Sequence, residues 1–191
     1  MHSPEFLRAT NAAYDAAHPA RNIIGITKQE HERVAREVLA LFPKAPYELV
    51  CSVREAELIK YAGNFFLYLK VLFANIVFDL AGAEGAEYEV IRRAVSADPR
   101  IGPSHLAVSH VSGHKGSKEG RGAGGLCFIK DIAALRALYE EKLPHDTEGI
   151  RMLRALECKN SALLMASEKD VDLVKGVYGD APEEAKRELL K

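Results

Sequence analysis

Apolar and polar residues alternate along the first fifty positions in a pattern that predicts two short strands around one helix. Residues 22–27 and 47–53 are short apolar runs bounded by turn-forming residues, which indicates strands. Between them, residues 29–42 carry apolar side chains at helical spacing and stop before Pro43. Residues 3–17 predict a loop or short strand that leads into a helix. The order is therefore β-α-β, present only as a fragment of a larger sheet.

The long segment after the second strand is apolar around most of its faces. Ser52 and Glu55 have the spacing of a capping box, so we expect a helix that begins there and reaches Ala81 or Gly82. Its polar residues recur near multiples of the helical period and form one stripe. Such a stripe faces a cavity, a ligand or a hydrogen-bond network, or it is an ordinary solvent-facing side. Lys70 falls off the stripe and predicts a second face that reaches water. The stripe consists of Glu57, Lys60, Asn64, Tyr68, Asn75 and Asp79.

The second half of the chain predicts shorter helices interrupted by one long loop. The loop covers residues 101–125 and is rich in Gly, Ser and His. Helical periodicity predicts helices over residues 84–95, 127–141, 148–167, 170–177 and 182–190.

Composition argues against several classes of partner and compartment. The chain has 191 residues, 48% of them hydrophobic, which suffices for one domain or one and a half with a real core. Its 26 basic and 27 acidic residues are spread along the sequence, so we expect no nucleic-acid partner. The start lacks the basic and apolar regions of a signal peptide, and three distant cysteines fit reduced thiols, so we expect a cytoplasmic protein. The apolar run 65–83 contains three polar residues, which disfavours a membrane span.

Two segments carry residues suited to covalent chemistry at a carbonyl carbon. Lys60 and Asn64 place an ammonium and an amide group one helical turn apart. Cys127 follows a glycine-rich stretch at a predicted helix start, where the helix dipole and free N–H groups stabilise a thiolate. Asp131 lies one turn later. The alternative interpretation of Cys127 is a small core residue.

The long loop contains two patterns that invite other interpretations. Gly120, Gly122 and Gly125 match the spacing of a dinucleotide fingerprint, but no strand is predicted before them, so we expect no dinucleotide site there. These glycines either let a ligand approach the backbone or form a flexible loop. Three histidines at spacings typical of no zinc motif are expected to be solvated, and we expect no metal site. They are His105, His110 and His114.

Three segments, in order, resemble the UDP-glucose/GDP-mannose dehydrogenase family of nucleotide-sugar 6-dehydrogenases. Residues 3–8, Ser-Pro-Glu-Phe-Leu-Arg, resemble the segment that closes the first domain of that family. Residues 55–64, Glu-Ala-Glu-Leu-Ile-Lys-Tyr-Ala-Gly-Asn, resemble the helix that opens its central domain. Residues 122–131, Gly-Ala-Gly-Gly-Leu-Cys-Phe-Ile-Lys-Asp, resemble its catalytic cysteine motif.

The resemblance implies oxidation of the C6 hydroxymethyl group of a nucleotide sugar to a carboxylate, with NAD as cofactor, in polysaccharide biosynthesis. It implies that Cys127 is the nucleophile, which holds the aldehyde as a thiohemiacetal and then as a thioester. Lys60 and Asn64 would stabilise the oxyanion, and Asp131 would assist proton transfer. The implied sugar-binding residues are Glu5, Phe6, Leu7, Gly122, Gly124 and Gly125.

The resemblance also completes the prediction of fold and domains. We expect a mainly α protein: a helical dimerisation domain with a long central helix, preceded by a short β-α-β remnant of a Rossmann-like domain. Residues 1–52 would be the remnant, residues 53–145 the helical central domain with the cysteine motif, and residues 146–191 a C-terminal helical extension. The long helix is apolar around most of its circumference, which is more apolar surface than a small monomer can bury. We therefore expect a homodimer.

Departures from the family leave two functions open. The NAD-binding domain and the C-terminal nucleotide-sugar domain of the family are not recognised in this sequence. We therefore expect a central part of the enzyme that is inactive alone or is completed by a separate NAD-binding polypeptide. Ala9 stands where the family has a glutamate used in hydrolysis. This favours the alternative, a non-catalytic dimeric protein that binds nucleotide sugars or acts as a scaffold.

Overall fold

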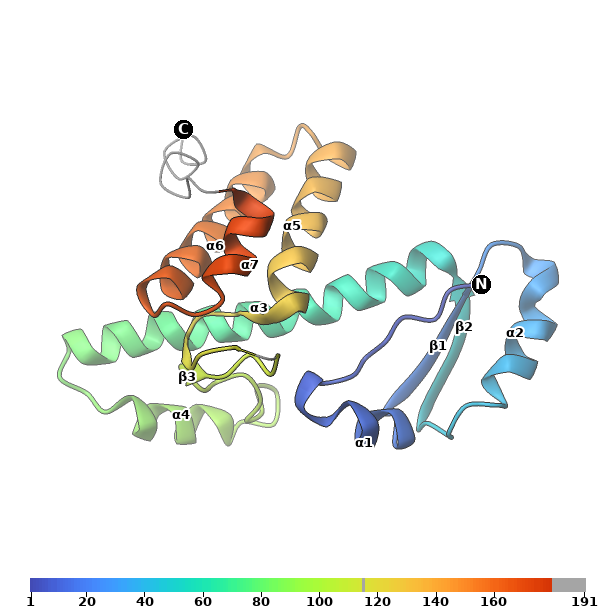
Figure 1. The fold of residues 1–191 in the computed structure, drawn as a ribbon, viewed down its shortest axis with the longest axis horizontal. Helices are drawn as coiled ribbons and strands as arrows, with labels where there is room; N and C mark the ends of the chain where they lie inside the picture. The colour runs from blue at the N-terminus through green and yellow to red at the C-terminus, as the bar shows by residue number, and fades with distance from the viewer. Residues whose placement is uncertain (115, 180–191) are drawn as a thin grey trace. The chain divides into compact units, whose positions relative to one another are not determined.

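The computed structural model describes residues 1–114 and 116–179, and its contacts divide the chain into two compact units. The first unit is Met1–Gly63 and the second is Asn64–Lys191, and each is described by itself (Figure 1). The first unit contains η1 (Ala9–Asn11), α1 (Ala12–Ala17), β1 (Arg21–Ile26), η2 (Gln29–His31), α2 (Glu32–Leu39) and β2 (Tyr47–Ser52).

Strands β1 and β2 of the first unit are parallel, with Ile24 opposite Val50. Parallel neighbours need a crossover connection, which α2 supplies, and α2 packs against both strands. The core between them consists of Ile24, Ile26, Ala35 and Leu39. The predicted β-α-β fragment is therefore confirmed.

Helix α3 (Val53–Ala83) is the long central helix, and both of its ends are fixed by local hydrogen bonds. At the start, the Ser52 amide donates to the Glu55 carboxylate at 2.8 Å, and the Glu55 amide donates to the Ser52 hydroxyl at 3.2 Å. This is the predicted capping box, although Val53 begins the helix and does not end the strand. At the other end, Gly85 has a φ of 67°, and the amide after it donates to the Ala81 carbonyl at 2.8 Å. That geometry is a Schellman motif, which ends the helix.

Among the described residues, the second unit contains the rest of α3 and six further elements. The predicted helix over residues 84–95 begins four residues late, because residues 84–87 form the turn after α3. The predicted loop holds a small antiparallel hairpin, and the next helix starts at residue 125, two residues before the predicted start. The helix predicted over residues 182–190 lies outside the described residues. The elements are α4 (Tyr88–Ser96), β3 (Ser109–His110), β4 (Gly120–Arg121), α5 (Gly125–Lys142), α6 (Thr147–Ala166) and α7 (Val171–Tyr178).

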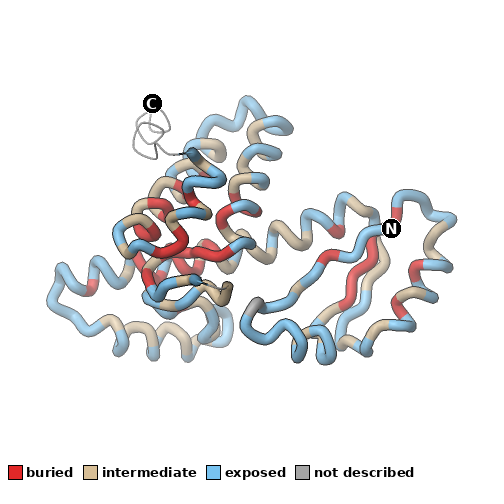
Figure 2. Tube along the Cα trace, viewed as in Figure 1, coloured by how far each residue is buried: buried red, intermediate tan, exposed pale blue. Residues whose placement is uncertain are grey.

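The core of the second unit lies where α3 meets the loop before α5 and where α5, α6 and α7 contact one another. Buried positions gather there in Figure 2. One cluster comprises Tyr68, Val71, Leu72, Ala123, Ile132 and Leu163, and a second comprises Ile129, Leu164 and Val174. The mainly α fold with one long central helix is as predicted.

The polar stripe of α3 faces a hydrogen-bond network within the second unit. The Tyr68 hydroxyl donates to the Leu156 carbonyl at 3.1 Å. The Asn75 side chain, which is fully buried, accepts from Arg121 at 2.8 Å. Asp79 accepts from the same arginine at 2.6 Å. Of the interpretations offered for the stripe, the structure supports a network at these positions.

Lys70 does not reach water, so that prediction was wrong. Its residue is only 8% exposed, and its ammonium group donates to the Ile101 carbonyl at 2.9 Å and to the Ser104 hydroxyl at 3.1 Å. Burial lowers the pKa of Lys70. Lys70, which lies outside the polar stripe of α3, therefore holds the loop after α4 in place.

Helix α3 is also long and apolar enough to meet a length-and-composition test for a membrane-spanning helix, a test that core helices of soluble proteins pass as well. Part of its apolar surface in the second unit is exposed. Phe66 is 59% exposed, Phe73 45%, Ile76 51% and Leu80 60%. Their spacings of seven, three and four residues place them on one face, which is typical of a helix–helix seam.

Candidate functional site

Cys127 lies in the first turn of α5 and its thiol is exposed. The helix begins at Gly125 with an N-cap at Gly124, so the cysteine is the third helical residue, where free N–H groups and the helix dipole act. Cys51 and Cys158 are only partly exposed, and burial together with Glu55 raises the pKa of Cys51. The predicted nucleophile therefore has the most open position among the three cysteines.

Asp131 lies one turn after Cys127, and its carboxylate is held by two donors. Its side chain is 8% exposed. One oxygen accepts from the Asn64 side-chain amide at 2.7 Å, and the other accepts from Lys130 at 2.6 Å. The structure thus brings together Asn64 and Asp131, which are 67 residues apart in sequence. An asparagine amide has two N–H groups, so Asn64 can hold the carboxylate and still donate to a ligand.

The glycine-rich loop before Cys127 is buried, so the interpretation as a flexible loop does not describe it. The Ala123 amide donates to the Asn160 side chain at 2.7 Å, and the Asn160 side chain donates back to the Ala123 carbonyl at 2.9 Å. The Gly125 amide donates to the Asp170 carboxylate at 2.7 Å. Two of the loop amides are therefore used within the fold. The assignment of Gly122, Gly124 and Gly125 to sugar binding stays a prediction.

The same loop does not fit a dinucleotide. The strand before it, β4, has two residues and pairs antiparallel with β3, whereas the fingerprint needs the end of a strand in a parallel sheet. The amides that would hold a pyrophosphate are directed at Asn160 and Asp170. The residues that match the fingerprint spacing therefore serve the packing of the loop.

The three loop histidines are partly buried, so the expectation of solvated histidines was wrong. The Nδ1 atoms of His105, His110 and His114 are buried and have no hydrogen-bond partner among the described residues. Burial, with a contribution from nearby Lys169, lowers the pKa of His110 to about 4. Within the described ranges, no three His, Cys, Asp or Glu side chains are placed to hold a metal ion.

The remaining predicted site residues lie in the first unit. The Lys60 ammonium donates to the Glu5 carbonyl at 2.6 Å and lies 5.8 Å from the centre of the Phe6 ring. Arg21 covers the same ring at 4.0 Å. Glu5, Phe6 and Leu7 line a hollow of about 550 Å³. The structure therefore joins Lys60 to the segment predicted to line the sugar site.

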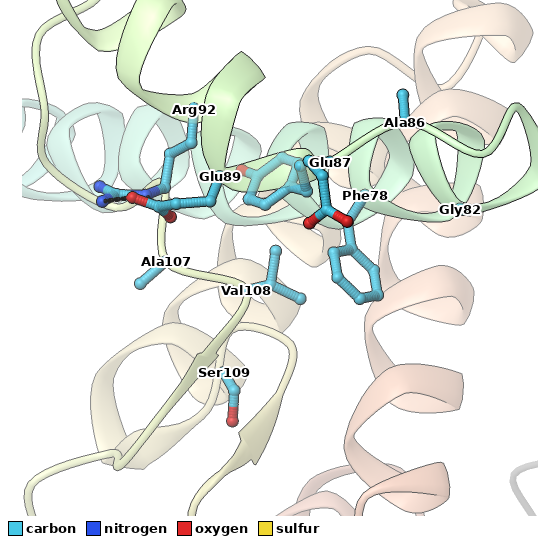
Figure 3. A pocket seen from close by; sticks show the side chains of 10 residues that line it. Phe78, Gly82, Ala86, Glu87, Glu89, Arg92, Ala107, Val108 and Ser109 are labelled. Atoms are coloured by element: carbon cyan, nitrogen blue, oxygen red, sulfur yellow. Dashed lines mark hydrogen bonds and ion pairs between the residues drawn. The ribbon is translucent and has the colours of Figure 1, made fainter.

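A second hollow, of about 590 Å³, lies in the second unit beside α4 (Figure 3). The rings of Phe78 and Tyr88 meet edge to face there, and Arg92 pairs with Glu89 at its rim. None of the predicted site residues lines this hollow. This hollow is therefore separate from the glycine-rich loop before Cys127.

Sequence reasoning missed the side chains that hold the glycine-rich loop before Cys127. Asn160, Lys169 and Asp170 are each at most 5% exposed and all bond the loop backbone. One signal was available for Asn160, a polar residue on the apolar face of a predicted helix. Lys169 and Asp170 precede a short helix and resemble ordinary capping residues.

Comparisons with known proteins match most of the chain. Residues 54–161 match the model of the UDP-glucose/GDP-mannose dehydrogenase family, central domain. A putative UDP-glucose 6-dehydrogenase of Bacillus subtilis, YtcA, is 38% identical over 85% of this chain and 34% of its own. A UDP-glucose 6-dehydrogenase of Rickettsia typhi is 38% identical over 72% of this chain and 30% of its own.

A solved structure of a UDP-glucose dehydrogenase from Pyrobaculum islandicum superposes with a TM-score of 0.65 at 34% identity. That match covers 81% of this chain and 33% of the other. The chain thus spans about a third of the length of the relatives it matches.

Proposed function

Because the chain belongs to the UDP-glucose/GDP-mannose dehydrogenase family, we propose that it is the central, part-catalytic section of a nucleotide-sugar 6-dehydrogenase. One observation carries the proposal. The exposed thiol of Cys127 stands in the first turn of α5, one turn before a carboxylate that Asn64 holds at 2.7 Å. A thiolate, an amide donor and an oriented carboxylate are the groups that addition to an aldehyde requires.

In the proposed step, the Cys127 thiolate adds to the C6 aldehyde of the sugar. The new S–C bond forms while the π electrons of the carbonyl move to its oxygen, which then takes up a proton to give a thiohemiacetal. Asn64 and Lys60 donate to the developing oxyanion, and Asp131 assists the proton transfer. The support for Asn64 and Asp131 is their mutual hydrogen bond, and the support for Lys60 is the family resemblance.

Oxidation of the alcohol and of the thiohemiacetal requires a hydride acceptor, which the family points to as NAD. The glycine loop does not fit a dinucleotide, so NAD would be bound elsewhere. We propose that NAD is held by a separate NAD-binding polypeptide.

The proposed assembly is a homodimer that forms through the exposed apolar face of α3. Phe66, Phe73, Ile76 and Leu80 support it, because a row of large apolar side chains on one helix face is costly to leave in water. The same face, covered by a second copy, would make α3 a core helix. We also propose a cytoplasmic protein with no membrane partner, and with no nucleic-acid partner because its 26 basic and 27 acidic residues are spread along the sequence.

The test is titration calorimetry of the purified chain with UDP-glucose and GDP-mannose, each with and without NAD. We expect one of the two sugars to bind and to slow the alkylation of Cys127 by iodoacetamide. Cys127→Ser, which lacks this thiol, is the control that assigns the labelling to Cys127. Absence of binding by both sugars would contradict the proposal. Binding without any protection of Cys127 would favour the non-catalytic binding or scaffold protein, which Ala9 also favours.

A further inference from the structure

Asp170 acts as a cap for a helix that begins 45 residues earlier in the chain. Its side chain is fully buried, and one carboxylate oxygen accepts from the Gly125 amide at 2.7 Å and from the Ser112 hydroxyl. The first amides of a helix have no partner within it, and a carboxylate is a strong acceptor for them. N-cap Gly124 has no side chain to do this. Asp170 therefore satisfies the first turn of α5, which carries Cys127.

Lys169, next to it, binds the other side of the same loop. Its residue is fully buried, and its ammonium group donates to the Gly120 carbonyl at 3.3 Å and to the Gly122 carbonyl at 3.1 Å. Burial lowers the pKa of Lys169 to about 8. A charged group is retained in the core only where its hydrogen bonds compensate for lost hydration, and here they are made to the loop.

The glycines of the loop fit closely around these two side chains. A Cβ atom at Gly124 would lie 2.1 Å from the Asp170 carboxylate, and one at Gly120 would lie 2.9 Å from the Lys169 Cβ. Both distances are too short for any side chain, so glycine is required for this contact. The loop is therefore rich in glycine because it packs closely against these two side chains.

The backbone of the segment between α6 and α7 is adapted to the same contacts. Glu168 and Asp170 have φ values of 53° and 52°, a left-handed conformation that is rare outside glycine. Such conformations persist where surrounding contacts over-determine them and cluster at functional sites. These residues lie beyond residue 161, where the match to the family model ends.

We propose that Lys169 and Asp170 are positioning residues that hold the glycine-rich loop and the first turn of α5, and through them set the reactivity of Cys127. The inference rests on the proposed function only in treating Cys127 as the nucleophile. Neither side chain touches the reacting atoms. Their effect passes through the loop backbone and through the helix start that favours the thiolate.

Hydrogen–deuterium exchange with peptide mass analysis of the full 191-residue chain tests the inference. We expect Asp170→Ala to speed exchange in residues 121–127 at least tenfold and Lys169→Met to speed it at least threefold. Asp170→Asn should restore most of the protection, because an amide oxygen still accepts from the Gly125 amide. Asp172→Ala, in the exposed first turn of α7, is the matched control and should stay within twofold of the wild type.

Alkylation of Cys127 by iodoacetamide gives the second readout. We expect Asp170→Ala to slow it at least threefold toward the rate in denaturant, and Asp170→Asn to restore it. A rise in exchange spread evenly over α3, α5 and α6, or an unchanged Cys127 rate, would overturn the inference. Should Asp170→Ala fail to fold, Ser112→Ala removes a hydrogen bond to the same carboxylate and makes the same comparison. Failure of the proposed function would show separately, as a wild-type chain that binds no nucleotide sugar.

Discussion

At the scale of single residues, Cys127 differs from the other two cysteines in its environment. Cys127 is exposed at a helix start, while Cys51 and Cys158 are partly buried. We expect Cys127 to be alkylated several-fold faster than either of them at neutral pH, because thiolates are favoured at helix N-termini and burial disfavours them. Timed labelling with iodoacetamide followed by peptide mass analysis measures the three rates.

Labelling in denaturant, where the three cysteines lose their different environments, is the control for that comparison. A Cys127 rate no higher than the rate of Cys158 would remove the chemical basis of the nucleophile assignment. The scaffold alternative would then be the better description of the chain.

His110 gives the second unit a pH dependence whose sign follows from its pKa. Burial, with Lys169 and His105 nearby, lowers that pKa from 6.5 to about 4, against smaller opposing effects of an Ala107 backbone hydrogen bond and of Asp170. Between pH 6.5 and 4 the unfolded chain therefore binds a proton that the folded chain does not. We therefore expect the free energy of unfolding to decrease as the pH falls through this window, by less than about 3 kcal/mol from this residue because solvent screens part of the effect.

Urea denaturation between pH 4 and 8 measures the effect. His110→Gln should flatten the curve in that window. His145→Gln, at an exposed position of the same unit, should not. Equal slopes for the two variants would contradict the assignment of this pH dependence to His110.

At the residue scale, the sequence can single out side chains that belong to a local motif or a family motif, while their roles stay predictions. Asn64 and Asp131 are singled out by their residue types and spacing and by the resemblance, and they lie in hydrogen-bond contact. Lys169 and Asp170 were missed because their partners, Gly122 and Gly125, are 47 and 45 residues away and are backbone groups. A sequence gives no sign of which backbone atoms a distant side chain meets.

At the scale of elements, the long helix α3 was the most predictable from the sequence. The turn and the small hairpin that follow it were the least predictable. The capping box of Ser52 and Glu55 and the continuous apolar pattern located the helix. The break at residues 84–87 was missed because alanine and glutamate there favour helix, whereas the positive φ of Gly85 ends it. The small hairpin of β3 and β4 was missed because two-residue strands leave no periodicity.

The exposed face of α3 yields a prediction about assembly. We expect the wild-type chain to sediment as a dimer at micromolar concentration and the double variant Phe73→Glu/Ile76→Glu as a monomer. Each large apolar side chain that becomes buried contributes about 1.5–3 kcal/mol, so two charges in the seam should abolish association.

Leu138→Glu, at an apolar position of α5 that is 37% exposed, is the matched control and should leave the dimer intact. Analytical ultracentrifugation distinguishes these outcomes. A wild-type chain that stays monomeric, or a double variant that stays dimeric, would refute the role of this face.

At the scale of the whole molecule, the proposed capture of an aldehyde by Cys127 is not matched by a cofactor site, because the glycine loop does not fit a dinucleotide. We expect the purified chain to produce no NADH from UDP-glucose or GDP-mannose with NAD, because nothing among the described residues positions a nicotinamide beside the sugar. Absorbance at the NADH band measures this. The UDP-glucose 6-dehydrogenase of Rickettsia typhi serves as the positive control. Steady NADH production by the chain alone would overturn this expectation.

The short parallel pair β1–β2 has a consequence for how the chain behaves in solution. Within the described residues β2 pairs only with β1, so its outer edge presents backbone N–H and C=O groups to water. Sheets of two strands are marginal by themselves, and open edges recruit further strands. Along β2, amides that point outward should exchange quickly while those that point toward β1 stay protected. A concentrated solution of the chain is therefore expected to aggregate through this edge, and a lysine on the exposed side of β2 should improve its solubility.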